Sequence, residues 1–99
     1  MTLTKNTKRN KSIITMNLNK TSLYDIVQII KQDWKSVYFS AKPYLEAMEH
    51  LNSINGSIGQ DSGREIILYF LINSKQWKGQ TAREIKLHLR ELINENNER

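Results

Sequence analysis

The clearest helical pattern along the chain begins at residue 23, where apolar residues recur every three or four positions. Ser22 is a suitable N-cap, and Asp25 lies in the first turn, where the helix dipole favours an acidic group. The apolar positions form a stripe about 120° wide. They are Leu23, Ile26, Val27, Ile30, Trp34, Val37 and Tyr38. The pattern predicts an amphipathic helix of about sixteen residues, with Trp34 in the core.

A second helix is predicted to begin near Ser40, with Pro43 in its first turn, where the missing N–H costs little. Its apolar side is formed by Tyr44, Ala47, Met48, Leu51 and Ile54. Asn55–Gly56 is expected to end this helix, because glycine accepts the left-handed conformation of a C-cap. Residues 57–61 are predicted to form a loop.

The third predicted helix contains the most apolar segment of the chain. Ser62 and Glu65 have the spacing of a capping box, and residues 66–72 are all apolar. Such a run is also compatible with a buried strand, but the capping box favours a helix that is buried on nearly all sides. On this interpretation Leu68→Asp or Phe70→Asp should abolish the fold, because each would bury an unpaired charge.

A fourth helix is predicted after Gly79, because Thr81 and Glu84 repeat the spacing of a capping box. Its narrow apolar stripe consists of Ala82, Ile85, Leu89, Leu92 and Ile93. Residues 94–99 are polar and are expected to fray into solvent. Four helices with short links predict an all-α fold, a compact four-helix bundle or array.

Charge divides the chain into two parts. The net charge is +5, and five basic residues precede the first acidic residue, Asp25. The remaining ten basic residues equal the ten acidic ones in number. We therefore expect a flexible basic arm at residues 1–20, disordered for want of apolar groups, and a single helical domain at 21–99. Alternation of Ile14, Met16 and Leu18 leaves open a strand that docks on the domain, and Met16 is an alternative start.

Several functional classes are disfavoured by the composition. The chain has no cysteine, which removes thiolate nucleophiles and thiolate metal sites and fits a reducing cytoplasm. His50 and His88 lie on different predicted helices without a second ligand at metal-binding spacing, and we expect both to be half-exposed. Residues 55–63 are glycine-rich but lack the Gly-Lys-Ser/Thr ending of a phosphate-binding loop. We expect a cytoplasmic protein that is not an enzyme, with no cofactor, metal, membrane segment or secretory signal.

Basic residues gather on the fourth predicted helix. Arg83, Lys86 and Arg90 lie within about 60° on the helical wheel, and none has an acid three or four residues away. Lys75 and Lys78 precede them, and Leu87 points outward among these charges. One interpretation is a surface that contacts phosphate or an acidic protein. The other is a solvated helix face with one exposed leucine.

Trp77 lies in the turn before this helix and has two interpretations. It either covers the core between the third and fourth helices, which we favour, or is an exposed hot spot for binding. The candidate partner-binding residues are Lys75, Trp77, Lys78, Arg83, Lys86, Leu87 and Arg90.

The favoured function is a small non-enzymatic binding or regulatory module that acts through protein–protein contacts. The alternative is a nucleic-acid-binding accessory protein that uses the basic arm and the fourth helix. Residues 65–92 also have the order of part of a helix-turn-helix. If the fourth helix is the recognition helix, its basic face would meet DNA; if it is the first helix of the pair, the chain ends before the recognition helix. The neutral domain weakens this interpretation. Ile29 and Leu87 are candidate dimer contacts, and the oligomeric state stays open.

Four stretches carry a resemblance to a known group: WKSVYF at 34–39, PYLEAM at 43–48, ILYFL at 67–71 and WKGQTAREIK at 77–86. Together they resemble small helical proteins of unknown function carried by bacteriophages and other mobile elements, over about residues 22–92. That group has no established chemistry, so the resemblance implies no site residue. It implies a bacterial or phage cytoplasm and an accessory role, such as binding and modulating host machinery.

Overall fold

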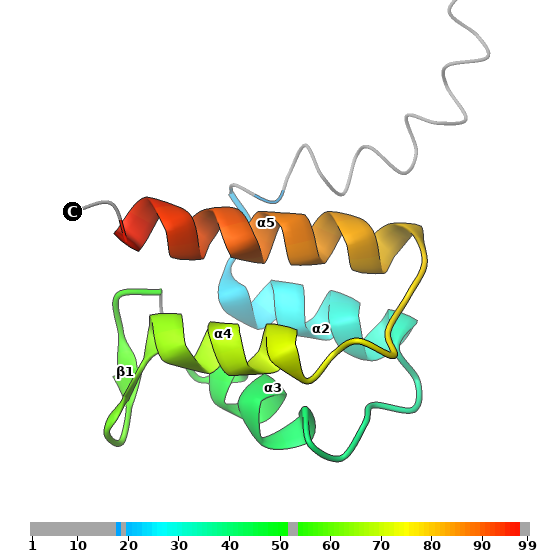
Figure 1. Cartoon of the computed structure of the whole chain (residues 1–99), viewed down its shortest axis with the longest axis horizontal. Helices are drawn as coiled ribbons and strands as arrows, with labels where there is room; N and C mark the ends of the chain where they lie inside the picture. Colours follow the sequence, from blue (N-terminus) through cyan, green and yellow to red (C-terminus); the bar gives the residue numbers. More distant parts are fainter. Residues whose placement is uncertain (1–17, 19, 52–53, 98–99) are drawn as a thin grey trace, which may run out of the picture.

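The computed structural model describes residues 18, 20–51 and 54–97, with side chains described as far as Asn94. Within these residues the chain forms four helices and one small hairpin (Figure 1). In chain order the elements are α2 (Leu23–Asp33), α3 (Lys42–Glu49), β1 (Ser57–Ile58), β2 (Asp61–Ser62), α4 (Gly63–Ile72) and α5 (Gln80–Asn97). The prediction of a mostly helical protein is confirmed.

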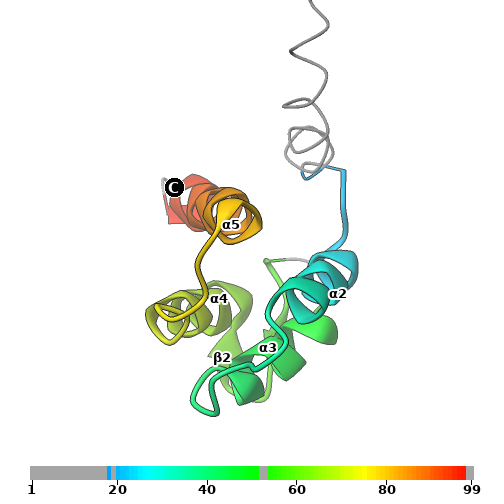
Figure 2. The same ribbon diagram turned by 90° about the vertical axis from the view of Figure 1, so that its right-hand side faces the viewer.

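The helices form two layers, α2 with α3 and α4 with α5 (Figure 2). Each helix packs on two others: α3 lies between α2 and α4, and α5 closes the circle by contacting both α4 and α2. Helices α4 and α5 run side by side in opposite directions (Figures 1 and 2). The core lies between the layers, where each helix contributes its buried stripe.

Helix α2 begins as the sequence predicts, with the Ser22 hydroxyl oxygen accepting a hydrogen bond from the Asp25 amide at 3.0 Å. The predicted length of about sixteen residues is wrong, because the helix ends at Asp33 and the backbone of Trp34 leaves the helical region at ψ 84°. Val37 still packs against the core from the following loop, whereas Tyr38 is exposed. Because a residue of the following loop also packs on the core, the spacing of apolar residues in the sequence extends beyond the end of the helix.

Helix α3 has Pro43 in its first turn, as predicted, but ends at Glu49 with His50 as its C-cap. The predicted end at Asn55–Gly56 is wrong. Leu51 is nevertheless buried, so its side chain joins the core from the segment after the helix.

The predicted loop at 57–61 is partly a hairpin, in which β1 and β2 pair antiparallel. Gly59 opens its two-residue turn with a φ of 61°, which glycine adopts without strain. Gly63 has a different reason to be glycine, since a Cβ at this position would overlap the backbone carbonyl of Ile54. Gly59 and Gly63 therefore serve a turn and a close backbone contact.

Helix α4 confirms the capping box. The Ser62 hydroxyl accepts from the Glu65 amide, and the Glu65 carboxylate accepts from the Ser62 amide, each at 3.1 Å. The run is thus a helix and not a strand, but the expectation of burial on nearly all sides is wrong. Ile66, Ile67 and Phe70 are buried. The exposed residues of the run are Leu68, Tyr69 and Ile72.

Helix α5 begins at Gln80 and continues to Asn97. Thr81 therefore lies inside the first turn and not at the predicted N-cap, and residues 94–97 are helical where fraying was expected. The predicted apolar stripe is confirmed: Ala82, Ile85, Leu89 and Ile93 are buried and Leu92 packs against them.

Leu18 shifts the boundary of the domain. It is 2% exposed and belongs to the core, so the packed body includes a residue that the sequence assigned to the arm. The Thr21 amide donates to the Leu18 carbonyl at 3.0 Å, which holds this segment against α2. Residues 1–17 and 19 of the predicted arm, among them Ile14 and Met16, lie outside the described residues.

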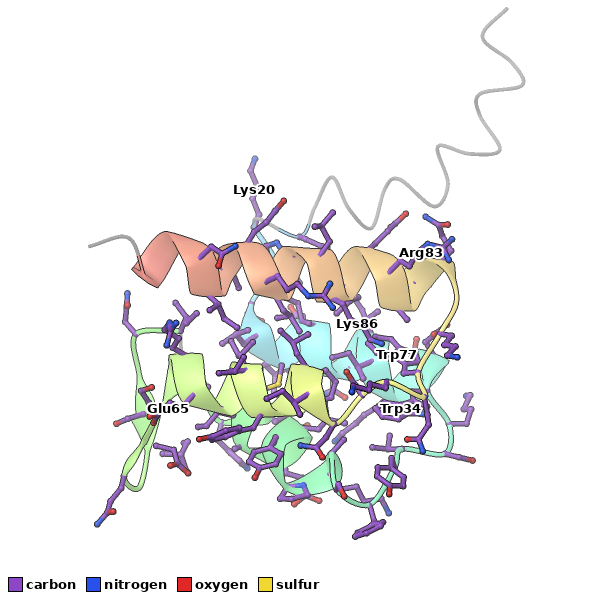
Figure 3. All side chains as sticks on the ribbon, viewed as in Figure 1. Lys20, Trp34, Glu65, Trp77, Arg83 and Lys86 are labelled. Atoms are coloured by element: carbon purple, nitrogen blue, oxygen red, sulfur yellow. The ribbon has the colours of Figure 1, made fainter. Side chains whose placement is uncertain are left out.

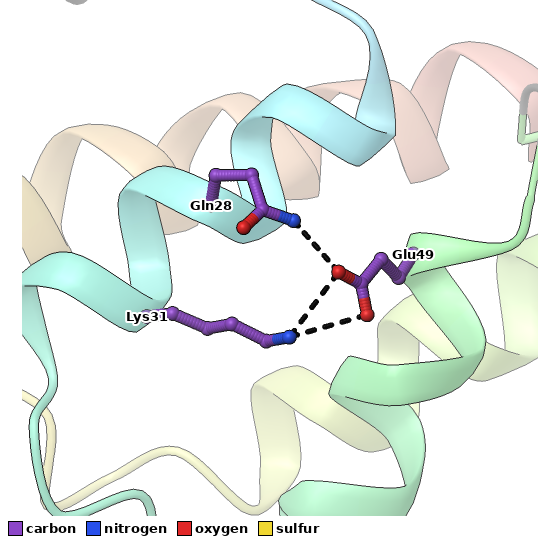
Figure 4. A network of polar contacts seen from close by, with 3 residues as sticks. All are labelled: Gln28, Lys31 and Glu49. Atoms are coloured by element: carbon purple, nitrogen blue, oxygen red, sulfur yellow. Dashed lines mark hydrogen bonds and ion pairs between the residues drawn. The ribbon is translucent and has the colours of Figure 1, made fainter.

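A polar network joins α2 to α3 at the surface (Figure 4). The Glu49 carboxylate accepts hydrogen bonds from Gln28 Nε2 at 2.7 Å and from Lys31 Nζ at 3.2 Å. The Gln28 bond and then the Lys31 bond lower the pKa of Glu49 below its usual value. The polar side of α2 is thus used to fix α3.

Candidate protein-binding surface

The structure separates the seven candidate residues into buried and exposed groups, although they are close in the sequence. Trp77 is 2% exposed and lies in the core, and Lys86 is half-buried. The five exposed candidates are Lys75, Lys78, Arg83, Leu87 and Arg90.

Trp77 covers the core, as the favoured interpretation predicts. Its ring stacks on Trp34 with centroids 5.8 Å apart and planes 7° apart, and both rings meet the edge or face of Phe70. The Trp77 indole N–H donates to Asp33 Oδ2 at 2.7 Å, so its polar atom is also satisfied. A partner at the surface therefore has little of this ring to contact.

Lys86 points inward from α5 toward the turn that precedes it (Figure 3). Its ammonium donates to the carbonyl oxygens of Ser74 and Trp77, both at 2.7 Å, and lies 5.7 Å from the centroid of the Trp77 ring. Desolvation, followed by the positive charges of Arg90 and Lys78, lowers the pKa of Lys86. Lys86 is therefore not part of a solvated helix face, because its side chain joins the turn to α5.

Arg83 and Arg90 remain on the outer side of α5. Arg83 donates to the side-chain oxygen of Gln80 at 2.7 Å, a contact within the first turn of the helix. Arg90 lies one helical turn beyond Lys86, and no described side chain forms a hydrogen bond or ion pair with its guanidinium. Leu87 is 53% exposed between them, as predicted.

A shallow groove runs between α4 and α5. Its volume is about 360 Å³, and it is lined by Leu68, Leu71, Ile72, Arg90, Ile93 and Asn94. Arg90 also lines a second hollow along the outer face of α5, with Arg83 and Leu87. We call these two hollows, which share Arg90, the α4–α5 surface. Its apolar part was missed by the sequence reasoning, although seven consecutive apolar residues on a helix cannot all face one core.

The described residues offer no metal-binding cluster. No group of three or more His, Asp or Glu side chains among them is placed to hold a metal ion. His50 is exposed at the end of α3, whereas His88 is buried, which corrects the expectation that both are half-exposed. None of the helices in the described ranges is both long and apolar enough to cross a membrane.

The helix-turn-helix interpretation does not fit the geometry. That motif joins two helices at about 90–120° through a turn of three or four residues. Here residues 73–79 separate α4 from α5, and the two helices lie antiparallel (Figure 1). The arrangement of α4 and α5 therefore differs from that of the motif.

Comparison of the chain with protein-family models, with curated proteins and with solved structures finds no match.

Proposed function

We propose that the protein is a small non-enzymatic binding module that contacts a partner protein through the α4–α5 surface. The observation that carries this proposal is that exposed apolar side chains lie beside Arg90, which pairs with no described side chain. Leu68, Ile72 and Leu87 are 37%, 52% and 53% exposed, and Arg90 borders both hollows that they flank. Contiguous apolar surface rimmed by polar groups is typical of interaction sites, and arginine is enriched there.

Nucleic-acid binding is the alternative, favoured by the basic residues at 75–90. Two features of the structure make it second. Lys86 already donates to two backbone carbonyls, which withdraws one charge from the outer face. The positive charge of Arg90 borders apolar side chains, which a phosphate backbone does not contact favourably. The resemblance to phage and mobile-element proteins supports a partner in the host machinery of a bacterial cytoplasm.

Charge reversal tests the proposal. The variant Arg83→Glu/Arg90→Glu alters the proposed surface, and Lys35→Glu/Lys42→Glu makes the same change in net charge on the other helical layer. Each variant should keep the helical circular dichroism of the parent, because exposed charges contribute only about 0–1 kcal/mol. Affinity capture from the source cells, with and without nuclease, should yield proteins bound by the parent and by the control but not by the arginine variant.

Two results would contradict the proposal. If both charge variants capture the same proteins as the parent, the α4–α5 surface is a solvated face. If capture disappears after nuclease treatment, the protein binds nucleic acid. The logarithm of its affinity should then fall linearly with the logarithm of the salt concentration.

A further inference from the structure

The walls of the α4–α5 groove restrict the conformation of a bound segment. Both walls are α-helices, whose interior N–H and C=O groups pair within each helix. In the last turn of α4, the carbonyls of Tyr69, Phe70 and Leu71 accept from the amides of Asn73 and Ser74. An extended peptide on this surface would therefore find no backbone partners for its own amides and carbonyls along the groove. A helical segment satisfies these groups internally and presents only side chains, which is what an apolar groove between two helices accepts.

The charge of the groove restricts the sequence of that segment. Among the described residues that line it, Arg90 is the one ionisable side chain, and its guanidinium lacks a partner on the described side chains. A carboxylate can accept two parallel hydrogen bonds from a guanidinium. A second copy of this chain, docked symmetrically through the same groove, would instead bring two arginines together.

We infer that the groove binds one amphipathic helix of the partner, with apolar side chains between Leu68 and Ile72 and a carboxylate on Arg90. This inference rests on the proposed function and names the occupant of the α4–α5 surface. Apolar residues of that helix spaced at i, i+3 or i+4 and i+7 would face Leu71 and Ile93 in the floor of the groove. An aspartate or glutamate beside this stripe would reach the guanidinium at the rim.

A displayed library of peptides about five helical turns long, with randomised positions, supplies the probe. Selection on the whole protein, with counter-selection on Ile72→Glu, should enrich peptides with a helical apolar period and an acidic residue at a fixed offset. An absence of enrichment, or enrichment of peptides without helical period or acidic residues, overturns the inference.

A charge swap then tests the role of Arg90 with one enriched peptide. Arg90→Glu should weaken its binding at least about tenfold, the order expected when a paired charge is reversed. Replacing the acidic residue of the peptide by arginine should restore binding to Arg90→Glu and weaken binding to the parent. Lys35→Glu serves as the control and should bind the original peptide like the parent. If the swap restores nothing, Arg90 does not pair with the helix and the inference fails.

The two proposals can fail separately. If no helical peptide is enriched but Arg83→Glu/Arg90→Glu still loses the captured protein, the surface binds a partner in another form. In that case the helical occupant is overturned and the binding module stands. If the charge variants also leave capture unchanged, both proposals are wrong.

Discussion

Near the 73–79 turn the interface between α4 and α5 is closed, whereas one helical turn further along α5 it opens into a groove. At the closed end, Trp77 packs against Trp34 and Phe70. Lys86 donates hydrogen bonds to two backbone carbonyls of the turn. At the open end, Leu68 and Ile72 remain exposed beside Arg90. The same two helices therefore build both a filled core and an unfilled surface.

The difference lies in what covers the helices and not in the helices themselves. The closing residue, Trp77, comes from the connection between α4 and α5, which folds back over their ends. No comparable segment among the described residues covers Leu68 and Ile72. Apolar side chains left in this state cost little in the folded chain but gain free energy when a partner covers them.

The largest expected effect separates two neighbours on α4. Phe70→Asp should abolish cooperative unfolding, because a charge without a partner in a small core costs several kcal/mol, comparable with total stability. Leu68→Asp should stay folded, since Leu68 is 37% exposed and its new carboxylate can reach water. This corrects the expectation that both substitutions unfold the chain.

Thermal unfolding followed by circular dichroism measures both variants. A Leu68→Asp chain that is unfolded at 25 °C would show that the groove is closed in solution. A cooperatively folded Phe70→Asp chain would show that the aromatic cluster is not the core.

A smaller effect distinguishes two cations on α5. Lys86→Met keeps an apolar stem but removes the donor for two carbonyls, and should cost about 1–3 kcal/mol. For a domain of this size the midpoint of thermal unfolding should fall by roughly 4–8 °C for each kcal/mol. Arg90→Met should change stability by less than about 0.5 kcal/mol, because no described side chain pairs with it. Equal midpoints for the two variants would show that the Lys86 contacts add nothing.

The sequence predicts those features whose causes are local. The capping box of Ser62 and Glu65 and the buried stripe of α5 depend on residues three or four positions apart, and both are confirmed. The ends of α2 and α3 were placed too late, because Val37 and Leu51 join the core from loops and continue the helical period. A helical spacing of apolar residues in the sequence therefore does not show at which residue the backbone leaves the helix.

The candidate surface was only partly predictable for the same reason. Exposure of Arg83, Leu87 and Arg90 follows from the position of each residue on the helical wheel. The inward direction of the Lys86 side chain does not follow from the helical wheel. Its partners are backbone carbonyls, which are present at every residue and therefore leave no sequence motif. Within a run of seven apolar residues, the pattern also cannot show which ones face outward.

The interface between α2 and α3 differs from both ends of the α4–α5 interface, because an exposed polar network holds it. Its disruption should have the smallest effect on stability. The Gln28 and Lys31 bonds lower the pKa of Glu49 in the folded chain, so the ionised carboxylate stabilises the fold at pH values above its unfolded pKa of about 4.3. This stabilisation should be lost as the pH falls through the lower, folded pKa. Urea titrations of the parent and of Glu49→Gln should therefore give free energies of unfolding that differ slightly at neutral pH and converge once the pH is below the folded pKa of Glu49. High salt should reduce the neutral-pH difference, since Glu49 and Lys31 are near the surface. A difference that persists unchanged at low pH would show that Glu49 acts through packing, as the residues of the closed end of α4–α5 do, and not through its charge.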